Sequence, residues 1–174
     1  QVTVGTRTHT MDDLFLVMGT QNPVEIEGTY PLPLAQVDRF LMRLHIGYPD
    51  EAVELDILAS NPSESIMPHI KPVCSRSQVL DARRAAEGLF CDEELMRAVV
   101  RIATATREHG AVEYGVSPRG SLMLLKAARA YALVRGRSYV IDQDIVDLAA
   151  PVLAHRIKLR DESVDARELV DEVA

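Results

Sequence analysis

Three positions in the sequence carry side chains suited to chemistry on a phosphate group. The first is Asn22, which follows the apolar run Phe15–Met18 within the stretch MGTQNP. An amide can donate and accept hydrogen bonds at once, so it can orient a water molecule beside a phosphate. Ligands of open α/β sheets bind beyond the carboxyl ends of the strands, which is where this amide would lie. The alternative is an Asx-turn before Pro23, in which the side chain only stabilises the bend.

The second position is Arg39, in the stretch AQVDRFL at the end of a short helix predicted over residues 34–40. Its apolar neighbours Phe40 and Leu41 would anchor it. A guanidinium that is held rigidly and projects outward can stabilise the charge on a transferring phosphoryl group, as an arginine finger does. The alternative is a surface ion pair, which contributes about 0–1 kcal/mol to stability.

The third position is Arg119, which follows Ser117 and Pro118. These two residues predict a helix start, with serine as the N-cap and proline as the first helical residue. The helix dipole disfavours a cation in this first turn by about 0.3–1 kcal/mol. An anion that bridges Arg119 and the free backbone amides would explain the arginine. An arginine that turns away to an acidic residue such as Glu113 would explain it equally well.

Two further stretches resemble phosphate or metal sites and are rejected. Residues 115–121, GVSPRGS, place Ser121 where a phosphate-binding loop needs lysine, and no strand precedes them. Residues 89–93, LFCDE, are too short for a strand that ends in magnesium ligands and suit a helix cap better. The scattered histidines and the two cysteines, Cys74 and Cys91, have neither zinc-ligand nor C-x-x-C spacing. The sequence therefore predicts no metal site and no disulfide framework.

The composition is that of a globular protein in a reducing compartment, and we expect it to be cytoplasmic. The 174 residues are 47% hydrophobic and 26% charged, with a formal net charge of −7. This charge argues against nonspecific binding to nucleic acid. No apolar run approaches the roughly 20 residues that a membrane span needs, and no signal peptide opens the chain.

The predicted secondary structure that must position these residues changes near residue 49, from a mixture of strands and helix to helices alone. Before it, the pattern predicts an incomplete α/β sheet, made of a hairpin around Gly5-Thr6, a buried strand over 15–19, a helix over 34–40 and a strand over 41–48. Two such strands cannot form a stable sheet alone, so we expect the rest of the sheet to be missing or to come from another chain.

After residue 49, the pattern predicts an all-helical bundle. Its helices are expected over 51–59, capped by Asp50, then over 77–87, from Asp92 to His109, over 118–135, from Asp142 with a kink or restart at Pro151, and over 165–173. The prolines at 62, 68 and 72 predict a loop between the first two helices.

The sequence resembles the MoxR family of AAA+ ATPases from about residue 1 to residue 160. The resemblance is carried, in this order, by FLVMGTQNP, EGTYPLPLAQVDRFLMRL, SPRGSLMLLKAARAYALVRGR, VIDQDI and VLAHRI. It implies a mostly α fold. Residues 1–48 would be the C-terminal fragment of an α/β AAA+ core, with two strands and a hairpin, and residues 49–174 would be the helical lid domain.

The resemblance also implies a role for each candidate residue. Asn22 matches sensor 1, Arg39 matches the arginine finger that acts on ATP in the neighbouring subunit, and Arg119 matches sensor 2. The Walker A and Walker B motifs would precede residue 1, so ATP and Mg²⁺ are expected in the intact protein and not on this fragment, which should be inactive alone. Leu34 replaces the glutamate of the usual PLPEAQ pattern, which puts any contact of that carboxylate in doubt.

For the intact protein, the resemblance implies ATP hydrolysis coupled to chaperone-like assembly or maturation of other proteins. It also implies a hexameric ring of identical subunits and a partner with a von Willebrand factor A domain, without nucleic acid or a membrane span. Two alternatives stay open. One is the ATPase subunit of a magnesium chelatase, and the other is a helical interaction module that never uses ATP.

Overall fold

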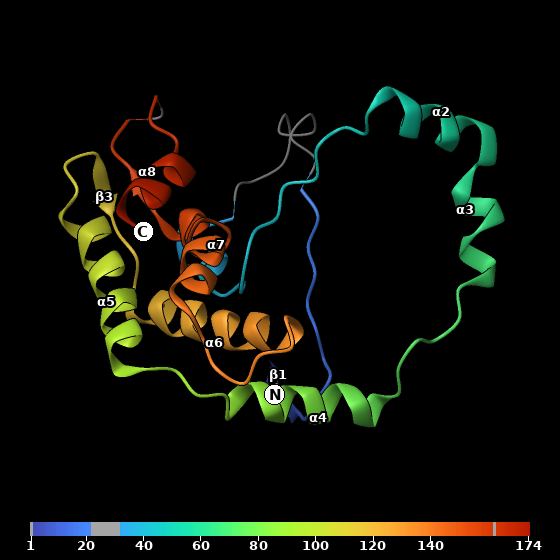
Figure 1. Ribbon diagram of the computed structural model, residues 1–174, viewed down its shortest axis with the longest axis horizontal. Helices are drawn as coiled ribbons and strands as arrows, with labels where there is room; N and C mark the ends of the chain where they lie inside the picture. Colours follow the sequence, from blue (N-terminus) through green and yellow to red (C-terminus); the bar gives the residue numbers. More distant parts are fainter. Residues whose placement is uncertain (1, 22–31, 162) are drawn as a thin grey trace.

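Before residue 76, the described part of the chain forms an open arc of short elements, and from residue 76 onward it forms a packed helical bundle (Figure 1). We call these two parts the arc and the bundle. A computed structural model describes residues 2–21, 32–161 and 163–174 of the chain. Within these ranges helices predominate, and the strands form two small antiparallel sheets. The predicted mostly α fold class is confirmed.

The arc begins with the predicted hairpin, formed by β1 (Val2–Val4) and β2 (Arg7–His9). Its turn contains Gly5 at a φ of 61°, a left-handed conformation that glycine adopts without steric cost. The next described element is the short helix α1 (Leu34–Val37), which confirms the expected helix but ends three residues before the predicted end at Phe40. Leu34, the residue that departs from the family pattern, begins this helix and is half-buried.

The far side of the arc contains α2 (Glu51–Ser60), α3 (Pro62–Ser65) and the 3₁₀ turn η2 (Met67–His69) (Figure 1). Asp50 caps α2 as predicted, because its Oδ1 accepts a hydrogen bond of 2.9 Å from the Val53 amide. The loop predicted after α2 is partly helical, because it contains α3 and η2. Pro62 is tolerated there because it occupies the first position of α3, where its missing N–H would have no helical partner.

The two strands predicted in this part of the chain are not formed. Residues 15–19 and 41–48 belong to no strand among the described residues. Side chains that the apolar pattern marks for burial are exposed, including Leu16 (73%), Met18 (85%) and Ile46 (97%). A strand that is buried on both faces needs neighbouring strands and covering helices. In the described part of this chain no strand pairs with either segment, although Met42 and Arg43 of the second one contact the bundle. The prediction of buried strands is therefore wrong for the chain on its own.

The bundle contains the later predicted helices close to their predicted bounds, whereas α2, which the sequence analysis assigns to the bundle, lies in the arc with all its residues exposed. The later helices are α4 (Arg76–Glu87), α5 (Glu93–Glu108), α6 (Pro118–Val134), α7 (Asp142–Leu153), the 3₁₀ turn η3 (Ala154–Arg156) and α8 (Ala166–Val173). Helix α6 packs against α4, α5 and α7, and α8 packs against α5 and α7. Helix α7 continues through Pro151 to Leu153, so the expected restart at the proline does not occur.

The core lies between these helices. Leu124 of α6 and Leu153 of α7 are fully buried, and Val99 and Ile102 occupy the predicted apolar stripe of α5. Alanines at the buried face of α6 (residues 127, 128 and 132) leave room for the neighbouring helices to approach closely. The bundle therefore has a contiguous hydrophobic core, which the arc does not.

A small sheet that the sequence did not predict closes one end of the bundle. β3 (Val112–Tyr114) pairs antiparallel with β4 (Lys158–Leu159), and a bulge interrupts the register. Glu113 on β3 forms an ion pair of 2.8 Å with Lys158 on β4. This sheet fixes the loop before α6 against the segment after η3, and these segments adjoin Ser117 and Arg156, which are described below.

Candidate functional site

The three candidate residues differ in what the structure shows of them. Asn22 lies outside the described residues, so its proposed sensor 1 role stays a prediction. Arg39 and Arg119 are both described, and both side chains are exposed. Among the described residues, neither guanidinium makes a hydrogen bond or an ion pair.

Arg39 occupies the turn that follows α1. Its backbone amide donates to the Gln36 carbonyl at 3.1 Å, which continues the helical turn by one step. The predicted anchor, Phe40 with Leu41, is weak, because Phe40 is only half-buried and Leu41 is 43% exposed. The apolar side chains therefore do not explain how this turn is held.

The turn is held instead by Arg156, a residue of η3 that is 2% exposed. Its Nη1 donates to the Asp38 backbone carbonyl and, at 2.8 Å, to Asp38 Oδ1. Its Nη2 donates to the backbone carbonyls of Phe40 and, at 3.2 Å, Leu41. Its Nε donates to the Val152 carbonyl at 2.7 Å. The buried guanidinium thus binds the chain on both sides of Arg39.

Arg119 is the second residue of α6. Ser117 caps this helix as predicted, with its Oγ 3.3 Å from the Gly120 amide. Glu113, which could have attracted Arg119, pairs with Lys158 instead. The structure thus removes the particular acidic partner that the sequence offered for Arg119 and leaves its guanidinium at the surface.

Asp38 and Ser117 bring the segments that carry the two arginines together. Ser117 Oγ donates to Asp38 Oδ1 at 3.3 Å, although the two residues are 79 positions apart in the chain. The carboxylate of Asp38 therefore joins Arg156 of η3 to the N-cap of α6. Asp38, Ser117 and Arg156 form a polar cluster, which we call the 38–117–156 cluster.

The sequence interpretation did not assign a role to Arg156. Its signal was an arginine inside the otherwise mostly apolar stretch VLAHRI, at the end of a helix that is buried on one face. A charged side chain at such a position is almost never fully buried unless it is paired. The pattern could therefore have indicated a partner, but not that the partner would be the Arg39 turn.

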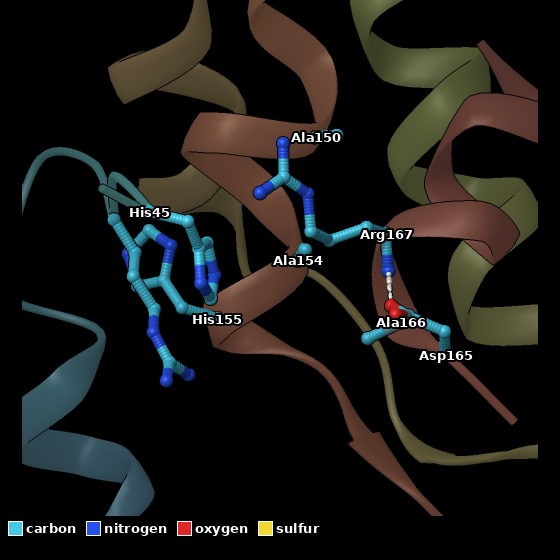
Figure 2. Close-up of a pocket in the computed structure, with 8 residues that line it drawn as sticks. His45, Ala150, Ala154, His155, Asp165, Ala166 and Arg167 are labelled. Carbon is cyan, nitrogen blue, oxygen red and sulfur yellow. Dashed lines mark hydrogen bonds between the residues drawn. The ribbon is translucent and has the colours of Figure 1, made fainter. Parts of the chain in front are cut away.

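A cavity of about 240 Å³ lies beside this turn, between the segment after it and the start of α8 (Figure 2). Its lining includes Arg43, His45, His155 and Arg167. His155 Nε2 lies 3.3 Å from the Phe40 carbonyl, which can only accept, so Nε2 donates. Burial lowers the pKa of His155. A neutral, inward-facing histidine of this kind adds a second donor to the Phe40 carbonyl, which Arg156 also binds.

Among the described residues, no hydrogen bond or ion pair joins two of the titratable side chains that line this cavity. Asp165, its carboxylate, caps α8 by accepting from the Arg167 amide at 2.6 Å. The described ranges also contain no group of three or more His, Cys, Asp or Glu side chains that could hold a metal ion. No helix in these ranges is long and apolar enough to cross a membrane.

Two family models match the chain. The model described as "ATPase family associated with various cellular activities (AAA)" matches residues 1–42, which include the Arg39 turn. The model described as "AAA lid domain" matches residues 104–173, which include Arg119 and Arg156. The 38–117–156 cluster therefore joins the two matched parts.

Individual proteins match nearly the whole chain. "Chaperone MoxR1" of Mycobacterium tuberculosis is 41% identical over 182 residues, covering 99% of this chain and 46% of that protein. "Uncharacterized protein YeaC" of Bacillus subtilis is 43% identical over 176 residues, covering 99% of this chain and 55% of that protein. The chain thus spans about half the length of these curated relatives.

A solved structure gives the same result for the fold. A crystal structure from Cytophaga hutchinsonii, described as that of a candidate ATPase, matches with a TM-score of 0.88 and 34% identity. The match covers 99% of this chain and 56% of the other. Sequence and structure agree, and the chain belongs to the MoxR family of AAA+ proteins, with a fold that fits a C-terminal fragment of such a protein.

Proposed function

We propose that this chain supplies an arginine finger, Arg39, to ATP held by a neighbouring subunit of the intact protein. The observation that carries the proposal is the state of the Arg39 turn. Its backbone is bound on both sides by a buried arginine, while the Arg39 side chain is exposed. A group that must reach a phosphate on another subunit needs this combination of a fixed base and a free end.

Arg39 and Arg119 suit phosphate oxygens. A guanidinium is planar and always charged, and its fork of N–H donors can contact two oxygens at once. Bound ATP with Mg²⁺ would supply the phosphoryl group that is transferred to water, and we assign no Mg²⁺ ligand to this chain. Arg39 would offset the negative charge that develops on the phosphoryl oxygens, Arg119 would contact phosphate as sensor 2, and Asn22 would orient the water.

The wider function follows the family. The relative named "Chaperone MoxR1" supports a role in which ATP hydrolysis drives the assembly or maturation of partner proteins. We further propose a hexameric ring, a partner with a von Willebrand factor A domain, and a cytoplasmic location. Residues 1–48 would be the end of the nucleotide-binding core, and residues 49–174 the lid. A magnesium-chelatase subunit is the second candidate, and stimulation of ATP hydrolysis by a tetrapyrrole substrate would favour it.

The test is the variant Arg39→Ala in the full-length protein. An arginine finger contributes about 10³–10⁵ in rate, so we expect ATP turnover to fall by that factor while ATP still binds. Arg97→Ala is the control, because Arg97 is also exposed but forms only surface ion pairs with Glu93 and Glu94. Normal turnover by Arg39→Ala would exclude the finger role.

A mixing experiment tests whether Arg39 acts on the neighbouring subunit. Asn22→Ala should inactivate the ATP site of its own subunit, whereas Arg39→Ala should inactivate the site next door. Mixed rings of the two inactive variants would then contain some interfaces with both residues intact, and ATP turnover should reappear on mixing. No recovery, in rings shown to exchange subunits, would indicate that Asn22 and Arg39 of one subunit both act on the ATP site of that subunit.

A further inference from the structure

The guanidinium of Arg156 uses every donor that it has. Its five N–H groups meet five acceptors, of which four belong to the Arg39 turn and one, the Val152 carbonyl, belongs to its own segment. The side chain is fully buried, and the Asp38 carboxylate, 22% exposed, is its ion-pair partner. A planar fork with all its donors bound can occupy only one orientation.

The four acceptors lie on the two sides of Arg39 and none lies on Arg39 itself. Two belong to Asp38, and the other two are the carbonyls of Phe40 and Leu41. Nη1 binds Asp38, which precedes Arg39, and Nη2 binds the carbonyls of Phe40 and Leu41, which follow it. The distance between these two parts of the backbone is therefore fixed by the width of one guanidinium. The direction in which Arg39 leaves the turn is fixed with it.

The same contacts attach the turn to the start of α6. Ser117 both caps α6 and donates to the Asp38 carboxylate. Gly120 in the first turn of α6 leaves the space that Arg156 fills, since a Cβ at Gly120 would lie 3.1 Å from Arg156 Cδ and 2.6 Å from Val116 Cγ1. The helix start, the buried arginine and the Arg39 turn are therefore packed as one unit.

We propose that Arg156 is a positioning residue that fixes Arg39 on the lid, so that the arginine finger moves together with the start of α6. This inference rests on the proposed function of Arg39. Arg156 is buried and cannot touch a nucleotide, so it acts only through the turn that it holds. A rotation of the lid would then carry Arg39 toward or away from the neighbouring ATP without any change inside the turn.

The main experiment is a double-mutant cycle of Arg156→Lys and Arg39→Ala in the full-length protein, with kcat and KM for ATP as readouts. Lysine keeps the charge but cannot bridge the turn. A misplacement of about 1 Å can cost about 10² in rate, so we expect Arg156→Lys to lower kcat about 10²-fold and to leave KM unchanged. In the Arg39→Ala background, the same substitution should change kcat less than about twofold.

The outcomes separate this inference from the function on which it rests. If Arg39→Ala turns over ATP normally, the finger role fails. If Arg39→Ala is slow and Arg156→Lys slows it further by the full factor, the finger role stands and the positioning role is wrong. Arg137→Lys is the matched control, because Arg137 forms an ion pair with the buried Asp144 of the same bundle and touches no part of the Arg39 turn. We expect Arg137→Lys to leave kcat unchanged.

A distance measurement covers the case in which a variant is too slow to assay or folds poorly. Spin labels at positions 39 and 119, with Cys74 and Cys91 replaced, report the separation of the finger from the start of α6. The distance distribution should be narrow in the parent protein and broad in Arg156→Lys. Asp38→Asn, which removes the shared carboxylate charge while keeping the residue's shape, should broaden it as well. Equal widths in all three proteins would overturn the proposal.

Discussion

The arc and the bundle are both rich in apolar residues, yet only the bundle buries them. Leu124 and Leu153 in the bundle are fully buried, whereas Leu16, Met18 and Ile46 in the arc are largely exposed. The difference does not lie in the amino acids but in what surrounds them. Helices α5 to α8 present apolar faces to one another, whereas most of the large apolar side chains in the extended segments of the arc face solvent.

The two parts make their most buried polar contact at the Arg39 turn. Elsewhere they meet through Met42, which packs partly buried against the core, and through the Arg43 amide, which donates to the Pro151 carbonyl at 2.9 Å. They also meet through the surface ion pair of 2.8 Å between Asp12 and Arg76, which are both more than half exposed. Exposed pairs contribute little, typically about 0–1 kcal/mol. The 38–117–156 cluster is therefore the most buried polar contact between the arc and the bundle, and it joins the two parts of the chain that the family models match.

The largest expected effect comes from removing core volume in the bundle. Leu124→Ala should lower the free energy of unfolding by about 2–5 kcal/mol, because Leu124 is fully buried and a cavity would remain. The matched substitution Leu16→Ala in the arc should change it by less than about 0.5 kcal/mol. Denaturant unfolding of the 174-residue chain measures both.

The same pair of variants tests the contrast further in the full-length protein. If the arc packs on the remainder of the polypeptide there, Leu16→Ala should become as costly as Leu124→Ala. Equal and small effects of Leu16→Ala in both chains would mean that the arc stays exposed in the intact protein, against its apolar pattern.

The next largest effect concerns an ion pair inside the bundle. Asp144 is 1% exposed, and a hydrogen bond from Arg137 holds the pKa of its carboxyl below the usual value. Arg137→Met would leave this carboxylate buried without its partner, and the loss of one member of a buried pair costs about 3–5 kcal/mol. We expect a loss near the lower figure at pH 7, because Arg137 is partly exposed and the Ile141 amide still donates to Asp144.

The pH dependence of that loss has a definite sign. Because the folded-state pKa of Asp144 is depressed, the pair's contribution is present above the ordinary aspartate pKa and is lost as the pH falls through the folded-state value. The difference in unfolding free energy between the parent protein and Arg137→Met should therefore shrink as the pH is lowered below about 4. A difference that stays constant in acid would show that the cost of Arg137→Met comes from packing and not from charge.

The sequence predicted the bundle well because its signals are local. The caps at Asp92 and Ser117 and the stripe on α5 each depend on neighbours within a few residues, and the structure confirms them. The strands expected over 15–19 and 41–48 failed because a strand's partners are distant in sequence. For the same reason, the β3–β4 sheet, with strands of two and three residues, left no pattern to detect.

The candidate site shows the same difference between local sequence signals and contacts of residues that are distant in the sequence. Arg39 and Arg119 were identified from local context, since each follows a recognisable turn or cap. The cluster that joins their segments was not predicted, because Asp38 and Arg156 are 118 residues apart and their contact depends on how α7 and η3 pack. Single-sequence reasoning found the groups that could do chemistry but not the groups that hold them.

The smallest expected effect compares two helix caps, one in each part. Asp92 accepts from the Glu94 amide at the start of α5, and Asp50 accepts from the Val53 amide at the start of α2. Loss of such a cap typically costs about 1 kcal/mol. Asp92→Ala should lower the global unfolding free energy by that amount, because α5 unfolds together with the core.

Helix α2 has ten residues, all exposed, and an isolated helix of fewer than about 12 residues is marginal in water. Asp50→Ala should therefore speed amide hydrogen exchange in α2 without moving the global transition. A global loss of about 1 kcal/mol from Asp50→Ala as well would show that the arc folds as one unit with the bundle.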